Sequence, residues 1–225
     1  MSVAAVVEAP RGQPDRLKLA EVFVSLQGEA LTSGVPTAFV RLTGCPLRCR
    51  YCDTAYAFTG GEWRSFEAIL DELESFGIEH VCVTGGEPLA QPRCAKLLTA
   101  LCDTGYAVSL ETSGAMDIGV VDPRVSRIVD IKTPGSGELE RNRWENLSLL
   151  TSRDALKLVI TDRGDYEWAR EMIRKHGALP CPVFFSPSHG ELAPADLGAW
   201  ILEDRLGVRL QIQLHTLLWG DERGR

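Results

Sequence analysis

The chain has 225 residues, of which 44% are hydrophobic and 24% charged, and its formal net charge is −7. This composition is typical of a soluble globular protein with one large domain or two small ones. The negative charge disfavours a broad nucleic-acid surface, and no apolar run approaches the ~20 residues that span a bilayer, so we expect a small-molecule substrate.

The two ends of the chain differ in character. Residues 1–18 are polar, rich in Ala, Pro and Gly, and have no signal-peptide core, so we expect a flexible N-terminal tail there. Residues 19–225 are expected to form a single domain. Seven cysteines, an odd number, indicate no disulfide framework, and we expect a cytoplasmic protein with reduced thiols.

Strand-like and helix-like segments alternate from residue 37 onward. The expected strands cover residues 37–43, 78–84, 106–111, 125–132, 155–161, 182–186 and 208–214. The expected helices cover 65–76, capped by Ser65, then 92–104, 166–176 and 194–205. This order predicts an α/β fold with a parallel sheet. These strands are fewer than the eight of a closed β/α barrel, so we expect a partial, open parallel β/α barrel of about six strands.

Three cysteines lie within eight residues, in the run Cys45-Pro-Leu-Arg-Cys49-Arg-Tyr-Cys52. Three thiolates on one loop can ligate three irons of a 4Fe–4S cluster, whose usual complement is four cysteines. The remaining iron would be open to a small molecule, which indicates chemistry rather than structure. A structural zinc site would need further ligands, commonly in pairs. The other cysteines offer no pair and are interpreted as small buried hydrophobes: Cys82, Cys94, Cys102 and Cys181.

Polar, glycine-rich loops follow nearly every predicted strand. Parallel α/β sheets bind ligands at the edge where the strands end, so one site would collect these loops. Turn formation alone would explain each loop separately, but not the hydroxyl groups and the charged Glu87, Lys132 and His189 among them. The loops are the cysteine run and residues 84–88, 111–114, 132–137, 186–190 and 214–216.

The cysteine spacing, with Tyr51 before the third cysteine, resembles the radical S-adenosylmethionine (SAM) enzymes. The run Thr84-Gly-Gly-Glu-Pro88 resembles their second motif, in which backbone groups and the glutamate receive the methionyl amino end. Glycines let a ligand approach the main chain closely. The resemblance implies that SAM chelates the open iron, and that an electron from the cluster cleaves it to a 5′-deoxyadenosyl radical.

After Lys18, almost the whole chain resembles the 7-carboxy-7-deazaguanine synthases. The resemblance rests on residues 21–29, 39–45, 51–54, 111–114, 130–134 and 211–215. That family converts 6-carboxy-5,6,7,8-tetrahydropterin to 7-carboxy-7-deazaguanine with loss of ammonia, toward queuosine. It uses SAM catalytically, is helped by Mg²⁺, and forms homodimers. The resemblance implies a lyase with a 4Fe–4S cluster, SAM and Mg²⁺, a pterin substrate and a flavodoxin-like or other electron donor, with no direct contact to nucleic acid or membrane.

The resemblance also assigns residues. Cys45, Cys49 and Cys52 would hold the cluster, and Thr54 the Mg²⁺, although Asp53 is the more obvious ligand from the bare sequence. The SAM pocket would be formed by Tyr51, Cys52, Asp53, Gly86, Glu87, Ser113, Lys132, Thr133, Pro134, Ser186, Pro187, Ser188 and His189.

The substrate side is assigned in the same way. Arg41 would receive the substrate carboxylate, because its planar fork suits a bidentate contact that Lys could not reproduce. A surface ion pair is the plain alternative, but Arg41 projects from a buried-looking strand. A lone histidine such as His215 is as often structural. The remaining substrate-binding candidates are Leu26, Gln27, Gly28 and Thr84, and the further catalytic candidates are Glu29 and His215.

Two positions depart from the family pattern, and two other functions stay open. Ala30 stands where Gly is usual, so a left-handed backbone there would be unmet or moved, and Thr216 replaces a common basic residue. A radical-activating enzyme that forms a glycyl radical on a partner protein would share the cysteines without needing Arg41. A non-catalytic iron–sulfur or zinc-binding protein is the other alternative.

Overall fold

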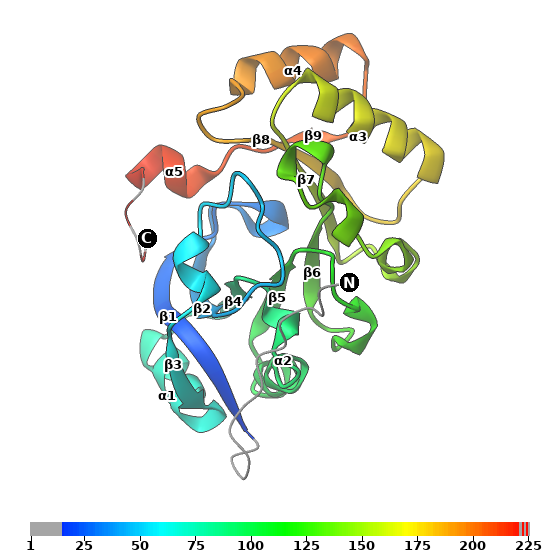
Figure 1. The fold of residues 1–225 in the computed structure, drawn as a ribbon. Coiled ribbons are helices and arrows are strands. Elements are labelled where there is room, and N and C mark those ends of the chain that lie inside the picture. The colour runs from blue at the N-terminus through cyan, green and yellow to red at the C-terminus, as the bar shows by residue number, and fades with distance from the viewer. Residues whose placement is uncertain (1–14, 221, 223, 225) are drawn as a thin grey trace.

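The computed structural model describes residues 15–220, 222 and 224. Within them, nine strands form one open sheet in the order β3-β1-β2-β4-β5-β6-β7-β8-β9 (Figure 1). The strands are β1 Arg16–Leu26, β2 Pro36–Leu42, β3 Glu62–Ser65, β4 His80–Gly85, β5 Ala107–Thr112, β6 Ser126–Asp130, β7 Ala155–Ile160, β8 Val183–Pro187 and β9 Arg209–Leu210. The predicted open α/β architecture is confirmed, with more strands than the sequence indicated.

The sheet has a parallel part and an antiparallel part. The strands β2, β4, β5, β6, β7, β8 and β9 are neighbours in that order, and each neighbouring pair is parallel, as expected. β1 and β3 add an antiparallel extension beside β2. Because β1 begins at Arg16, residues 16–18 belong to the sheet and not to the predicted tail. Residues 1–14 of that tail lie outside the described part of the chain.

Four amphipathic helices lie along the outer side of the curved sheet, and the segment after β2 crosses its hollow side (Figure 1). These helices are α1 Phe66–Phe76, α2 Cys94–Asp103, α3 Arg163–His176 and α4 Pro194–Glu203. Ser65 accepts a hydrogen bond from the Ala68 N–H, which confirms it as the cap of α1. α3 begins three residues earlier than predicted, because the Asp162 side chain accepts from the Asp165 N–H.

The apolar core lies between these helices and the sheet. Cys82, Cys94 and Cys181 are buried, as expected, whereas Cys102 is only partly buried. None of the helices in the described residues is long and apolar enough to cross a membrane.

The last predicted strand, 208–214, is wrong beyond Leu210. β9 covers only Arg209–Leu210, and α5 follows at Leu214–Trp219. The chain leaves the sheet because Gln211 and Leu214 bond back to the segment after β1: the Gln211 side chain accepts from the Ala30 N–H (2.8 Å), and the Leu214 N–H donates to the Gly28 carbonyl (3.1 Å). This turn places His215, which is on α5, against Gly28 just after β1.

Candidate active site

A cavity of about 600 Å³ opens at the edge where the parallel strands end. It collects the cysteine loop and the polar loops, as the sequence predicted. The predicted residues that line it are Leu26, Gln27, Gly28, Glu29, Arg41, Cys45, Cys49, Tyr51, Cys52, Asp53, Thr54, Thr84, Gly86, Ser113, Lys132, Ser186, Pro187, Ser188, His189 and His215. The structure does not bring Glu87, Thr133 or Pro134 to its wall.

The three clustered cysteines are free thiols on one side of this cavity. Burial raises the pKa of the Cys49 thiol to about 11, and the nearby Lys132 ammonium opposes that rise. Among the described residues, no three Cys, His, Asp or Glu side chains are placed to hold a single metal ion. Three thiols that share a cavity without converging on one point fit a multi-iron cluster better than a structural zinc ion.

The two glycines of the second motif are explained by chain packing. A Cβ on Gly85 would clash with the Leu42 carbonyl, and one on Gly86 with the Gly44 carbonyl. The Glu87 N–H donates to the same Gly44 carbonyl at 2.8 Å. The glycines therefore let the main chain of this loop lie directly against the start of the cysteine loop, and Gly86 also lines the cavity.

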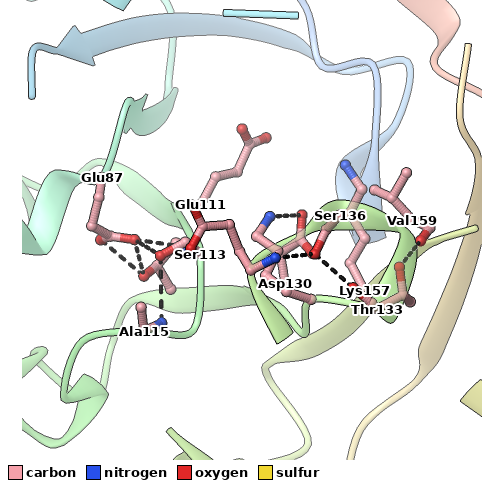
Figure 2. Close-up of polar contacts among 12 residues, drawn as sticks. Glu87, Glu111, Ser113, Ala115, Asp130, Thr133, Ser136, Lys157 and Val159 are labelled. Atoms are coloured by element: carbon pink, nitrogen blue, oxygen red, sulfur yellow. Dashed lines mark hydrogen bonds and ion pairs between the residues drawn. The ribbon is translucent and has the colours of Figure 1, made fainter. Parts of the chain in front are cut away.

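Glu87 lies beneath the cavity wall. It is fully buried, and its carboxylate accepts from the Leu89 N–H (2.9 Å), the Thr112 hydroxyl (3.0 Å) and the Ser113 N–H (2.7 Å). Figure 2 shows this network on one side of the site. The carboxylate therefore braces the loops after β4 and β5, and it holds in place Ser113, which does reach the cavity.

A second brace accounts for Thr133 and Pro134. The Thr133 hydroxyl contacts the Val159 carbonyl (3.0 Å) and Asp165 (2.9 Å), while Pro134 is exposed. Asp165, which the sequence analysis did not single out, is buried and also accepts from the Gly135 N–H at 2.7 Å. These bonds tie the loop after β6 to the start of α3, and of residues 132–134 only Lys132 lines the cavity.

Arg41 presents part of its guanidinium to the cavity. Its Nε donates to Glu21 at 2.7 Å, and its Cζ lies 5.4 Å from the centre of the Phe23 ring and 5.9 Å from that of Tyr56. Burial alone would lower its pKa, but Tyr56 and Glu21 outweigh it and raise the pKa, so the cation is retained. Within the described residues its terminal nitrogens have no hydrogen-bond partner, which leaves them for an anion.

Glu111 joins two predicted substrate residues and was not itself predicted to act. It accepts from Gln27 Nε2 at 3.4 Å and from the Thr84 hydroxyl at 2.8 Å. Figure 2 shows its side chain pointing away from the Glu87 network. Its position at the end of β5, beside the strand that carries Thr84, was the signal that could have identified it.

Gly28 and Ala30, just after β1, contact the C-terminal segment that carries Gln211 and His215. A Cβ on Gly28 would clash with the His215 ring, so glycine is required for the ring to lie there. Ala30 has a φ of 58°, and its N–H and carbonyl both bond to the Gln211 side chain. The expectation that a left-handed backbone would be unmet or moved here is therefore wrong, because Ala30 adopts that backbone despite its Cβ.

Asp53 and Thr54 place oxygen atoms side by side. The Thr54 hydroxyl donates to Asp53 at 2.6 Å, and Gln213 Nε2 donates to the other carboxylate oxygen at 3.2 Å. Desolvation would raise the pKa of Asp53, but these two hydrogen bonds and the charge of Lys157 hold it below its ordinary value. An ionised carboxylate next to a hydroxyl is a donor set compatible with Mg²⁺.

Buried polar atoms without partners gather at this cavity. Lys132 pairs with one oxygen of Asp130 at 3.0 Å. Within the described residues, four buried atoms of cavity-lining side chains lack a hydrogen bond: Glu29 Oε1, Tyr51 OH, Asp130 Oδ1 and Ser186 Oγ. Because buried polar groups are nearly always paired in folded proteins, these atoms indicate a polar ligand. The sequence analysis gave Asp130 no role.

Fold and site together define a radical SAM enzyme: residues 39–182 match the family model of the radical SAM superfamily. Within that superfamily the chain is 45% identical over 213 residues to the 7-carboxy-7-deazaguanine synthase of Chlorobaculum tepidum, covering 92% of this chain and 97% of the relative. The corresponding enzyme of Koribacter versatilis is 42% identical over 222 residues, with 92% and 98% covered.

A solved structure agrees with these relatives. The structure titled QueE from Escherichia coli superposes with a TM-score of 0.73 at 25% identity, covering 89% of this chain and 95% of that one. The chain belongs to the 7-carboxy-7-deazaguanine synthase family. This membership decides against the glycyl-radical and non-catalytic alternatives.

Proposed function

We propose that this protein converts 6-carboxy-5,6,7,8-tetrahydropterin to 7-carboxy-7-deazaguanine with loss of ammonia, as a step of queuosine biosynthesis. The observation that supports this most strongly is the convergence of three free thiols, Arg41 and the segment Gln27–Glu29 on one cavity. A cluster, a carboxylate receptor and a polar strand end are what a radical reaction on a small carboxylated heterocycle requires.

Cys45, Cys49 and Cys52 hold the 4Fe–4S cluster. The cluster, when bound, supplies an electron and an iron site to SAM, and this pair is the source of the radical that removes a hydrogen atom from the substrate. Around the loop, the Lys132 ammonium suits the methionyl carboxylate and the unpaired oxygen of Asp130 suits the methionyl amine. Ser186 supplies a further unpaired hydroxyl.

The substrate is oriented from the other wall. The unused nitrogens of Arg41 bind its carboxylate, and Phe23 and Tyr56 restrict the guanidinium plane. Thr54, with Asp53 beside it, would hold a Mg²⁺ ion, which would supply further positive charge for binding that carboxylate. Gln27, Thr84 and Glu111 form a hydrogen-bonded row next to it, and His215 lines the same cavity. Cytoplasmic location, a homodimeric state and a flavodoxin-like electron donor are further parts of this proposal.

The test is anaerobic incubation of the reconstituted protein with the pterin, SAM and a reductant, followed by mass analysis. Release of 7-carboxy-7-deazaguanine is expected. Failure to release it while the cluster is intact would overturn the substrate assignment. Arg41→Lys should lower kcat/KM by about tenfold or more, because a bidentate charged contact is lost. Arg163→Lys on α3, outside the cavity, is the matched control and should leave turnover unchanged.

A further inference from the structure

A buried ion pair between Lys157 and Glu29 lines the cavity. The Lys157 ammonium on β7 contacts Glu29 Oε2 after β1, and the two side chains are 12% and 8% exposed. Lys157 lies within the otherwise apolar strand Ala-Leu-Lys-Leu-Val-Ile. Burying a charge there costs desolvation free energy, so a function for the charge is expected.

Lys157 is surrounded by acidic groups. It is the register partner of Asp130 on β6, and Glu111 lies near enough to act on it. Burial alone would lower the pKa of Lys157, but Glu29, Asp130 and Glu111 outweigh it and raise the pKa. A lysine held in its charged form is a poor proton donor, so Lys157 is not suited to protonating the departing ammonia. It acts as a fixed cation.

Hydrogen-bonding capacity remains on both members of the pair. Glu29 is 6% exposed when its backbone is included, and its Oε1 has no partner among the described residues. An ammonium has three N–H donors, and among the described residues Glu29 is the acceptor that the Lys157 ammonium contacts. An unused acceptor therefore lies beside unused donors in the cavity. The complement of that arrangement is a ring N–H next to a carbonyl, which is the lactam edge of a pyrimidinone.

We propose that Lys157 and Glu29 together recognise the lactam edge of a bicyclic pyrimidinone substrate. Glu29 Oε1 accepts the ring N–H, and the Lys157 ammonium donates to the adjacent carbonyl oxygen. By holding Oε2, Lys157 also positions the Glu29 carboxylate. This inference rests on the proposed function. It assigns a part of the substrate other than the carboxylate that Arg41 binds, since Arg41 is on β2 and Lys157 on β7, with β4, β5 and β6 between them.

The inference is tested by selectivity in equilibrium binding to the SAM-loaded holoenzyme. The two probes are 7-carboxy-7-deazaguanine and its analogue with an amino group in place of the lactam oxygen. The wild type should bind the lactam about ten- to a hundredfold more tightly, as expected for buried hydrogen bonds to charged groups. Lys157→Met should remove most of this preference, and Lys157→Arg, which keeps a charged donor, should retain part of it. Lys175→Met, exposed on α3, is the control and should change neither affinity.

A Lys157→Met variant that keeps the full preference for the lactam would overturn the inference. If that variant does not fold, Glu29→Gln/Lys157→Met, which leaves no unpaired buried charge, is compared with Glu29→Gln. A double variant that is no less selective than the single variant would likewise contradict a direct contact from Lys157. Wild-type protein that binds neither compound would refute the proposed function itself, which separates the two failures.

Discussion

Buried ion pairs at the amino edge of the parallel sheet, where the strands begin, differ from those at the carboxyl edge, where they end. β6 has one such pair near each of its ends. Near the start of β6, Arg127 donates to both carboxylate oxygens of Asp154, at 3.0 and 2.6 Å. Its Nη1 also donates to the Ile118 carbonyl, and its Nη2 to the Leu149 carbonyl. Asp154 also accepts from the Thr151 N–H at 2.7 Å. At the other end of β6, the Asp130–Lys132 pair leaves one carboxylate oxygen of Asp130 buried without a partner.

The difference distinguishes ion pairs that stabilise the fold from ion pairs that are available to bind a ligand. A buried ion pair costs desolvation energy, and a saturated one such as Arg127–Asp154 recovers that cost within the protein. An unsaturated pair keeps hydrogen-bonding capacity for something else. Of the buried unpaired side-chain atoms in the described residues, those of Glu29, Tyr51, Asp130 and Ser186 belong to residues that line the carboxyl-edge cavity. At the amino edge of the strands the saturated pair stabilises the fold, and we expect the unpaired groups at the carboxyl edge to bind ligands.

The largest effect is expected at the cysteine loop. Cys49→Ser should abolish iron binding and turnover, because a serine hydroxyl is a poor substitute for a thiolate on iron. The fold should remain, with the free energy of unfolding of the apoprotein changed by about 1 kcal/mol or less, since the side chain faces the cavity. Iron analysis and thermal unfolding measure the two effects. Cys102→Ser, away from the cavity, is the control, and equal iron loss in both variants would contradict the assignment.

At the opposite edge, Asp154→Ala should destabilise the fold by about 3–5 kcal/mol, because it leaves the buried Arg127 charge unpaired. Denaturant unfolding measures this. Desolvation would raise the pKa of Asp154, but its hydrogen bonds from Arg127 and Thr151 hold it below the ordinary value. Its stabilising effect is therefore present above the unfolded pKa, about 4, and is lost as the pH falls through the lower folded value. Equal acid sensitivity in wild type and variant would argue against this pair.

The fold class could be predicted because the parallel strands are apolar runs such as Val81–Val83 and Leu156–Ile160, bounded by helices with caps such as Ser65. β1 was missed because only Leu17 and Leu19 of its residues are buried, so its apolar side chains do not mark out a strand with one buried face. The site motifs were found from cysteines, glycines and charges at strand ends. Sequence spacing could not show which charged residues line the cavity. Glu87 lies outside its wall and holds two loops together, whereas Lys157 reaches the cavity from within a strand.

A smaller effect is expected at Ser186, whose buried hydroxyl has no partner in the protein. Ser186→Ala removes that unsatisfied group, so the ligand-free protein should be as stable as wild type or more stable, by up to about 1 kcal/mol. Binding of SAM should weaken by about three- to tenfold through the lost hydrogen bond. Thermal unfolding without ligand and equilibrium dialysis with SAM measure the two quantities. A variant that is clearly less stable, with unchanged SAM affinity, would show that Ser186 belongs to the structural side of the comparison.

The smallest effect is expected at Ala30. Ala30→Gly relieves a left-handed backbone that costs a non-glycine residue about 1–2 kcal/mol. It also removes a buried methyl group worth about 0.8 kcal/mol, which packs with Ile128 and Phe184. The two terms oppose each other, so urea unfolding should show a change of about 1 kcal/mol or less. A loss above about 2 kcal/mol would mean that the alanine methyl matters more than its backbone strain.

We propose that the cavity at the carboxyl edge brings SAM and the pterin together, and this juxtaposition can be measured. It is tested most directly with pterin that carries deuterium on the carbon bearing the carboxylate, in an anaerobic reaction with the reconstituted protein. We predict deuterium in recovered SAM or 5′-deoxyadenosine, together with release of 7-carboxy-7-deazaguanine. Cleavage of SAM with no deuterium in either compound and no deazaguanine would contradict the account.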